Sequence, residues 1–392
     1  MKLGDLVRIV GGGTPSRKTE EYWGGDIPWI SVKDFKSNKI DKSTEYITTE
    51  GLENSSAKLI PKGNIIMPTR MALGKVALNE IDTAINQDLK ALIINDRNIL
   101  DTKYLLYFLM SKASYIESCG KGATVKGITI DVLTNLDITL PLIDEQRKIV
   151  RVLDIAQALI DKRKIQISEL SSLTQSLFWE MFGDPILNPK QYPKMTIKEV
   201  AVKDKGGIKS GPFGSQLLIS ELVEEGIPVF GIENVGVNNF IFTNNKAITI
   251  QKYDQLKSFR VKKGDILISR TGTVGRTCIT PQIDNGIIGP NLLKISLDES
   301  IVKPEYISHI FNYLPNIIDQ IKRVSPGATV AVFNTKNLKA IEILVPSLQE
   351  QIIFVNRVNK IEKQNKFFEE SLAQLENNFK SIMQQAFKGQ LF

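Results

Sequence analysis

The sequence predicts an α+β protein made of two similar globular domains, each followed by a long helix. Three observations lead to this prediction. The chain of 392 residues repeats itself with a period of about 205 residues. Each half contains short β-rich runs as well as segments with helical spacing. A long heptad pattern without Pro or Gly follows each half.

The repeat is carried by paired segments that occur in the same order in both halves. The pairs are IPWISVKDF (27–35) with IPVFGIENV (227–235), LIPKGNIIMPTRMALGK (59–75) with RVKKGDILISRTGTVGR (260–276), NQDLK (86–90) with GPNLLK (289–294), GATV (122–125) with GATV (327–330), and LPLIDEQ (140–146) with VPSLQEQ (345–351). A period of this length indicates a duplicated domain rather than a solenoid. The stretch GDPILNPKQYP (183–193) between the halves has the composition of a linker.

Both halves combine predicted strands with predicted helices. The expected strands, bounded by Gly, Pro and Asn, include NIIM (64–67), ALII (91–94), DILIS (265–269) and LKISL (293–297). The segments 102–119 and 304–321 have helical apolar spacing, and Pro315 is expected to kink or divide the second.

The segments 144–182 and 349–387 are predicted to be the long helices. Their 4,3-spaced positions are Ile149, Leu153, Ala156, Ile160, Arg163, Ile167, Leu170, Thr174, Leu177 and Met181 in the first, and Phe354, Val358, Ile361, Asn365, Phe368, Leu372, Leu375, Phe379, Ile382 and Ala386 in the second. Nearly all are apolar, so we expect the two helices to pack on one another along this seam. The alternative is that each helix lies on its own domain.

Composition and missing motifs exclude several classes of function. Two cysteines and one histidine exclude a Cys/His zinc knuckle and any two-His metal motif. The chain has no P-loop motif, and Asn188-Pro189-Lys190 lacks the second proline and the aromatic residue of an amino-methyltransferase motif. We expect no signal peptide and no membrane span, hence a cytoplasmic protein. The net charge of +7 mildly favours a polyanionic partner.

The remaining signals indicate a binding surface. GGGTPSRK (11–18) and GGIKSGPFGSQ (206–216) occupy equivalent places and offer Gly, Ser, Thr and basic groups, which suit phosphate and base edges; each alone is equally well explained as a surface turn. Basic residues also follow matching strands and flank both GATV turns. Trp23, Trp29 and Phe213 are expected either to stack on bases or to pack in the core.

These motifs together resemble the specificity (S) subunit of type I restriction–modification systems. The resemblance rests on GGGTPSRKTEEYWGGDIPWISVKDF (11–35), TRMALGKVAL (69–78), SGPFGSQL (210–217), SRTGTVGR (269–276) and the two Pro-x-x-x-Glu-Gln segments that begin the long helices. It covers essentially the whole chain. The implied domains are target recognition domain 1 (1–143), a central coiled-coil helix (144–185), a linker with target recognition domain 2 (186–348) and a C-terminal coiled-coil helix (349–392).

The resemblance implies a non-catalytic, DNA-binding subunit for DNA methylation and host defence. Each recognition domain would read one part of a split, asymmetric site in double-stranded DNA, and the helices would form an antiparallel coiled coil. The implied partners are methyltransferase (modification) subunits and a restriction (translocase–nuclease) subunit. The chain itself would hold no cofactor or metal; S-adenosylmethionine, ATP and Mg are expected on the partner subunits only. The alternatives are an S-like subunit of a fused restriction–methylation enzyme and a coiled-coil scaffold without a DNA role.

The residues expected to face DNA combine this resemblance with the basic and hydroxyl groups of the matched loops. They are Thr14, Pro15, Ser16, Arg17, Arg70, Lys75, Lys121, Thr124 and Lys126 in the first half, and Lys209, Ser210, Phe213, Ser215, Arg270, Thr271, Arg276, Lys322, Arg323 and Thr329 in the second. In the ungapped alignment of the two halves, Arg70 lies opposite Thr271 rather than Arg270.

Overall fold

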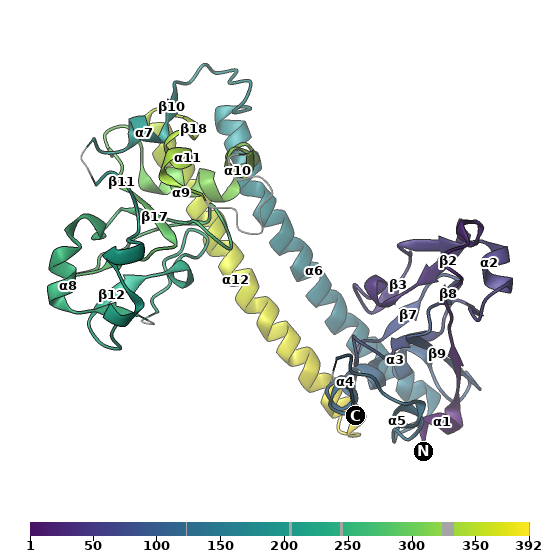
Figure 1. The fold of residues 1–392 in the computed structure, drawn as a ribbon. Coiled ribbons are helices and arrows are strands. Elements are labelled where there is room, and N and C mark those ends of the chain that lie inside the picture. Colours follow the sequence, from purple (N-terminus) through teal and green to yellow (C-terminus); the bar gives the residue numbers. More distant parts are fainter. Residues whose placement is uncertain (123, 204–205, 244–245, 324–332, 392) are drawn as a thin grey trace. The chain divides into compact units, whose positions relative to one another are not determined.

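The protein is described by a computed structural model, which covers residues 1–122, 124–203, 206–243, 246–323 and 333–391. The chain forms two compact units, the first made of Met1–Ile165 with Glu370–Phe392 and the second of Gln166–Glu369. Each unit holds one globular part and portions of the two long helices, α6 (Ile143–Phe182) and α12 (Leu348–Phe387) (Figure 1). The units therefore group the elements differently from the predicted domains, because each long helix contributes to both.

The globular part of unit 1 is built on two sheets. Within the described residues, one sheet has the strand order β1-β9-β6-β7-β3, with bounds Val7–Gly11, Leu89–Ile94, Ile65–Pro68, Ala77–Asn79 and Lys39–Ile40. The other has the order β4-β2-β8-β5, with bounds Glu45–Ile47, Trp23–Ile30, Thr83–Ile85 and Leu59–Ile60. The helices are α1 (Leu3–Leu6), α2 (Thr49–Glu53), α3 (Thr102–Ser111), α4 (Ala113–Ser118) and α5 (Ile130–Thr134).

The burial of strand β6 on both faces explains why its sequence is a continuous apolar run. Ile65 and Met67 pack into the core shared with α3 and α6, whereas Ile66 points into the core between the two sheets. Successive side chains of a strand face opposite sides, so a strand covered on both faces needs apolar residues at every position.

Unit 2 repeats this plan. Within its described residues, one sheet has the order β11-β17-β14-β15, with bounds Ile208–Ser210, Leu292–Ile295, Ile266–Ser269 and Thr277–Ile279. A second sheet has the order β13-β12-β16 (Ala247–Ile248, Ile227–Phe230, Ile287–Ile288), and β10 (Lys194–Thr196) pairs with β18 (Glu342–Leu344). The helices are α7 (Ile197–Val200), α8 (Ile250–Gln255), α9 (Pro304–Tyr313), α10 (Pro315–Arg323) and α11 (Thr335–Lys339).

The predicted strands and short helices are found, with one difference in the helices. The segment predicted as one helix over 102–119 is divided at Lys112 into α3 and α4. The division expected at Pro315 is confirmed, because α9 ends at Tyr313 and α10 begins at Pro315. A proline ring cannot continue the hydrogen-bond pattern of the preceding helix.

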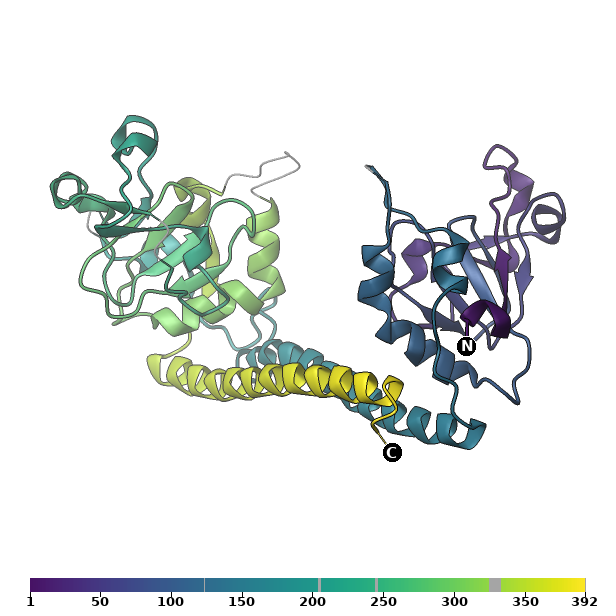
Figure 2. The same ribbon diagram turned by 90° about the horizontal axis from the view of Figure 1, so that it is seen from below.

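The long helices pack on one another along the predicted seam. Every seam position is buried or half-buried, while most residues between them are exposed. In unit 1 the start of α6 meets the end of α12, which brings Leu153 and Ile160 into one core with Phe379 and Met383. In unit 2 the end of α6 meets the start of α12, and Phe178 lies against Phe354. The helices therefore pair antiparallel within each unit (Figure 2).

Each helix also packs on the globular part that precedes it, so both arrangements considered for the helices are present. Tyr107 OH donates to Asp154 of α6 at 2.7 Å, and the Tyr306 ring contacts Phe354 of α12. No helix in the described ranges is long and apolar enough to cross a membrane.

Candidate nucleic-acid interface

Three loops of unit 1 meet at one end of its first sheet, along the edge that is formed by the ends of its strands. Strand β1 ends at Gly11, β6 ends at Pro68 and the antiparallel β9 begins at Leu89, so these ends lie together. The segments 12–17, 69–72 and 86–88 leave from this edge. We call these three segments, together with the described residues 121–122 and 124–127, the strand-end surface of unit 1.

Hydrogen bonds join these loops into one surface. The Thr14 hydroxyl donates to Oε1 of Gln87, and Thr69 N donates to the Asp88 carbonyl at 2.8 Å. The Arg70 guanidinium lies 3.6 Å from Oδ1 of Asp88. Gly127 joins this surface through a β-bridge with Arg70. Residues from four separate parts of the sequence therefore form one connected surface.

Unit 2 has the corresponding strand-end surface. Strand β11 ends at Ser210, β14 ends at Ser269 and β17 begins at Leu292. The segments 211–217, 270–272 and 289–291 leave from this edge and define the strand-end surface of unit 2. The second GATV turn, with Thr329, lies outside the described residues.

The strand register fixes which residues of the two surfaces correspond. Pro68 pairs with Leu89 in unit 1, and Ser269 pairs with Leu292 in unit 2. The residues directly after these strands correspond in the same way, because Thr69 N donates to the Asp88 carbonyl and Arg270 N donates to the Asn291 carbonyl. Thr69 is thus the counterpart of Arg270, and Arg70 is the counterpart of Thr271, in agreement with the ungapped sequence alignment.

A matched glycine lets each first loop pass close to the neighbouring chain. A Cβ atom on Gly12 would lie 2.0 Å from the carbonyl oxygen of Ile85, and one on Gly211 would lie 1.8 Å from that of Gly289. No side chain fits at either distance. The glycines of the two motifs therefore serve close backbone approach at the edge of the sheet.

The loop of Thr14 to Arg17 is held by internal contacts. The Arg17 guanidinium donates to both carboxylate oxygens of Glu45, at 2.5 and 2.9 Å, and lies 3.6 Å above the Trp23 ring. The hydrogen bond with Glu45 raises the pKa of Arg17 and lowers that of Glu45. Trp29 is buried, and its Nε1 donates to the Gly13 carbonyl at 2.9 Å.

Pro15 is a correction to the predicted contacts, because its side chain is buried. Ser16 and Arg17 are exposed and Thr14 is half-buried. The loop therefore offers its hydroxyls and one edge of a fixed guanidinium.

Arg70 and Arg270 differ in how much of each side chain is free. The Arg70 side chain is 58% exposed, and within the described residues its polar contact is the long pair with Asp88. The Arg270 side chain donates through Nε to the Phe333 carbonyl at 3.2 Å and through Nη1 to Ser210 Oγ and the Pro290 carbonyl, at 3.0 and 3.2 Å. Bidentate recognition of a guanine needs two free donor nitrogens on one edge. The Arg70 guanidinium has two such donor nitrogens, whereas the Arg270 guanidinium uses its donors to connect three loops.

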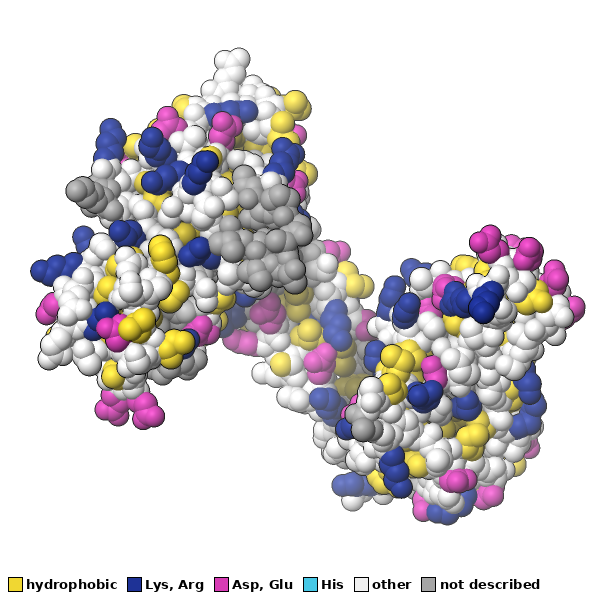
Figure 3. Space-filling view, viewed as in Figure 1, with side chains coloured by type: hydrophobic (Ala, Val, Ile, Leu, Met, Phe, Trp, Pro, Cys, Tyr) yellow, Lys and Arg dark blue, Asp and Glu magenta, His cyan; other side chains and the backbone are white. Residues whose placement is uncertain are grey.

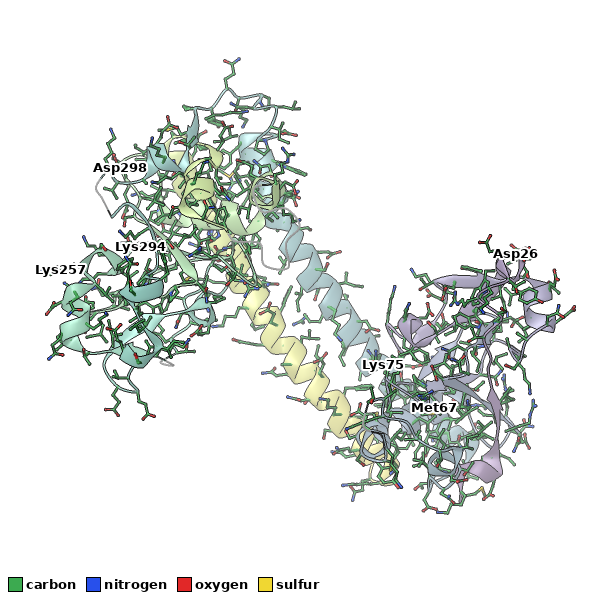
Figure 4. The ribbon with its side chains drawn as sticks, in the orientation of Figure 1. Asp26, Met67, Lys75, Lys257, Lys294 and Asp298 are labelled. Carbon is green, nitrogen blue, oxygen red and sulfur yellow. The ribbon has the colours of Figure 1, made fainter. Side chains whose placement is uncertain are left out.

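The other predicted residues of the first half divide between two places. Lys121, Thr124 and Lys126 are exposed on the strand-end surface of unit 1. Lys75 lies elsewhere, in a hollow of about 310 Å³ between the turn after β6 and helices α3 and α4, where its Nζ donates to the Phe35 carbonyl at 3.2 Å (Figure 4). The structure does not bring Lys75 together with Thr14 and Arg70.

The second half shows the same division. Phe213 and Ser215 are exposed on the loop after β11, while Lys209, Ser210 and Thr271 are half-buried. Lys209 Nζ lies 5.1 Å from the centre of the Phe259 ring. Arg276 and Lys322 line a hollow of about 340 Å³ that matches the one at Lys75, and Arg323 lines another hollow beside β18.

Sequence reasoning missed several residues of these surfaces. Gln87 and Asp88 in unit 1, and Pro290 and Asn291 in unit 2, lie on the loop that contacts the matched arginine or threonine, and Lys90 lies just beyond that loop on β9. In the sequence, these residues are indicated by the weak similarity between NQDLK (86–90) and GPNLLK (289–294). Lys90 Nζ donates to the carbonyls of Gln87 and Leu89, at 3.0 and 3.2 Å, and burial lowers its pKa.

Charged side chains are dispersed over the surface of each unit rather than clustered in one patch on the face that is drawn. On the face drawn in Figure 3, Lys and Arg side chains are spread over each unit with Asp and Glu among them. Among the described residues, no group of three or more His, Cys, Asp and Glu side chains is placed to hold a metal ion. Burial raises the pKa of the Cys278 thiol to about 12 and lowers that of His309 to about 4, so both groups are neutral at pH 7.

Comparisons with known proteins agree with the repeated fold. The chain is similar to the MjaIX specificity subunit of Methanocaldococcus jannaschii, with 32% identity over 47% of this chain and 43% of that protein. It is similar to the EcoR124I/EcoR124II specificity subunit of Escherichia coli, with 41% identity over 39% of each chain. These two alignments span less than half of either relative. The MjaVIII specificity subunit of M. jannaschii aligns over 100% of this chain and 92% of its own length, at 24% identity.

Solved structures show the same fold. The crystal structure of a type I restriction–modification S subunit from M. genitalium superposes with a TM-score of 0.54 and 18% identity, covering 99% of this chain and 95% of that one. A chain from a study of complex assembly and conformational transition of the type I system superposes with a TM-score of 0.64 and 20% identity, covering 100% and 97%. Residues 1–170 and 189–377 each match the type I restriction modification DNA specificity domain, and the chain is therefore a member of that family of specificity subunits.

Proposed function

We propose that this chain is the DNA-reading subunit of a type I restriction–modification complex and that each unit recognises one part of a split site. The observation that carries the proposal is the pair of strand-end surfaces, which share one backbone frame and carry different side chains. Where unit 1 has Thr69 and Arg70, unit 2 has Arg270 and Thr271. Two copies of one frame with different contact groups would read two different short sequences.

The proposed contacts fall into two classes. Lys121, Thr124 and Lys126 are exposed donors that suit phosphate oxygens, which position a protein on the duplex. Arg70 has a free edge and suits a guanine in the major groove. In unit 2 the exposed Phe213 beside Ser215 gives an apolar contact group with a neighbouring hydroxyl.

The long helices are the proposed docking surface for the methyltransferase subunits. Away from the seam, α6 exposes large apolar side chains: Ile155, at 64% exposure, Leu159 and Ile165 in unit 1, and Leu173 and Trp179, at 48%, in unit 2. Exposed apolar side chains in this number favour a protein partner over solvent. We place S-adenosylmethionine on the methyltransferase subunits and ATP and Mg on the restriction subunit. The complex would act in the cytoplasm, with no catalysis by this chain.

The test is the DNA sequence that the complex methylates. The full chain is produced with its methyltransferase subunits in a host without other adenine methylation, and modified sites are mapped across the genome. We expect a two-part motif with a spacer of fixed length. Replacing residues 1–143 by the corresponding domain of a relative with a different motif should change one part and leave the other intact. A simultaneous change of both parts, or methylation that does not depend on this chain, would contradict the proposal.

A further inference from the structure

One buried glutamine in each unit joins the globular part to its long helix. Gln146 lies in the first turns of α6 and Gln351 in those of α12, and both side chains are 0% exposed. They belong to the repeated Pro-x-x-x-Glu-Gln segment, yet they lie far from the strand-end loops in sequence.

The two glutamines make the same three hydrogen bonds. In unit 1, Gln146 Nε2 donates to the carbonyls of Ile99 and Pro141, both at 2.8 Å, and Oε1 accepts from Asp101 N at 2.9 Å. The amide thus uses both of its donor hydrogens and an acceptor site.

In unit 2, Gln351 Nε2 donates to the carbonyls of Ile301 and Pro346, at 3.1 and 2.9 Å, and Oε1 accepts from Lys303 N at 2.9 Å. Each partner has the same place in the fold as its counterpart in unit 1. We call each set of three bonds a glutamine latch.

Each latch ties together three segments that determine how a globular part sits on its helix. Asp101 is the N-cap of α3 and Lys303 is the N-cap of α9, so the latch holds the loop between the last strand of the first sheet and the following helix. Pro141 and Pro346 lie in the turn that leads into the long helix. A tyrosine adds a second tie in both units, from Tyr104 OH to the Thr139 carbonyl at 2.8 Å and from Tyr306 OH to the Leu344 carbonyl at 2.9 Å.

The neighbouring glutamate shows that the glutamine is the shared element of the motif. Glu350 caps its helix through Ser347 N and Oγ and accepts from Tyr192 OH at 2.7 Å. Within the described residues Glu145 makes no corresponding bonds, since the residue that matches Ser347 is Leu142, which has no hydroxyl. The glutamine contacts are the ones that recur in both copies.

From this geometry we infer that Gln146 and Gln351 are positioning residues that fix the angle between each recognition domain and its long helix, and thereby the spacer length that the complex accepts. The inference rests on the proposed function. A helix of 40 residues is about 60 Å long. A change of about 5° at its first turn moves its far end by about 5 Å, which exceeds one base-pair step of ~3.4 Å. Loosening a latch would therefore relax the choice of spacer without changing the bases that are read.

The experiment uses the full chain with its methyltransferase subunits and compares Gln146→Met with the parent. Methionine has nearly the same length and volume and removes all three hydrogen bonds. We expect the two half-site sequences to stay the same. Methylation at sites with one base pair more or less in the spacer, relative to the parental spacer, should rise about five- to tenfold. Gln351→Met should do the same from the other unit.

Gln157→Met is the matched control, because Gln157 is on the same helix and its amide donates to Asp161, at 2.9 Å, on the surface. If Gln146→Met lowers methylation at every spacer length by one common factor, the latch only stabilises the fold and the inference is wrong. Should that variant not fold, as judged by circular dichroism, Gln146→Asn keeps the amide but retracts it by one methylene and is judged by the same ratio. A parent without a two-part motif would instead contradict the proposed function.

Discussion

In unit 1 the residue after β6 is Thr69, and in unit 2 the residue after β14 is Arg270, although both strands pair with their neighbours in one register. The glutamine latches and the tyrosine ties also coincide in both units. The two halves thus keep the same connections deep in the fold and differ where the strands end. Buried bonds maintain the frame, which leaves the loop residues free to specify different partners.

The units also differ inside the first sheet. In unit 2, Lys294 on β17 lies 3.3 Å from Asp265, and both side chains are almost fully buried, at 6% and 4% exposure (Figure 4). In unit 1 the same places hold Ala91 and Asn64, and Asn64 donates to the Pro61 carbonyl at 2.9 Å. One frame therefore accepts a buried ion pair or a neutral amide.

The largest expected effect breaks this ion pair. Lys294→Ala leaves Asp265 as a buried charge without its cation, so the free energy of unfolding of unit 2 should fall by about 3–5 kcal/mol. Installing both residues of unit 1, with Asp265→Asn and Lys294→Ala, should recover most of this loss. The free energy of unfolding of both variants is measured by urea titration, with the unfolded fraction detected by its cleavage by a protease. A double variant as unstable as the single one would show that the two frames are not equivalent.

A smaller effect separates the units by pH. His309 in unit 2 is buried against Asn238 of the same unit, and burial lowers its pKa to about 4, whereas the matching helix position in unit 1 is Tyr107. Between pH 6.5 and 4 the unfolded chain binds a proton that the folded unit does not. Unit 2 should therefore have its full stability above pH 6.5 and lose about 2 kcal/mol between pH 7 and pH 5.

The control for this pH effect is His309→Gln, measured by urea unfolding at the same two pH values. Glu362 lies 3.5 Å from His309, and burial raises its pKa, so its protonation acts in the opposite direction. The difference between parent and variant isolates the histidine. An unchanged pH dependence in the variant would show that His309 does not cause the loss.

The next effect concerns the two arginines at the strand ends. Arg70→Ala should weaken binding of the complex to its own site by about 1–2 kcal/mol more than binding to unrelated DNA, because a guanine contact is lost. Arg270→Ala should weaken binding to both DNAs equally, because its donors face Phe333, Pro290 and Ser210. Fluorescence anisotropy with specific and unrelated duplexes measures both variants, and an equal loss of specificity in the two would remove the distinction between them.

The smallest effect lies on the surface of the helix pair. Lys164 and Glu376 form an ion pair of 3.1 Å in unit 1, with both side chains about half exposed. Solvent screens such a pair, so Glu376→Gln should change the free energy of unfolding by less than about 0.5 kcal/mol. Thermal unfolding at low and high salt checks this, and a loss above 1 kcal/mol would assign the helix pairing to charge rather than to the apolar seam.

Much of the fold follows from patterns that depend on local burial. The apolar runs at β6 and β14 predict strands because both of their faces are covered, and the heptad seam predicts the paired helices. The candidate site was less predictable. Arg270 looks like a free basic residue in sequence, but its donors are taken by carbonyls from segments 20 and 63 residues away. Pro15 lies in a loop motif and is nevertheless buried, because Trp23 and Trp29 of β2 bind the carbonyls of Ser16 and Gly13 on either side of it.

The grouping of the chain has a consequence for synthesis on the ribosome. Unit 2 is one continuous segment, whereas unit 1 takes Met1–Ile165 from the beginning of the chain and Glu370–Phe392 from its end. Phe379 and Met383 fill the core beside Leu153, so this apolar surface stays uncovered until these two residues have left the exit tunnel. The domain that is translated first is therefore completed last, and during most of translation the nascent chain carries a partly open hydrophobic core that a chaperone can bind.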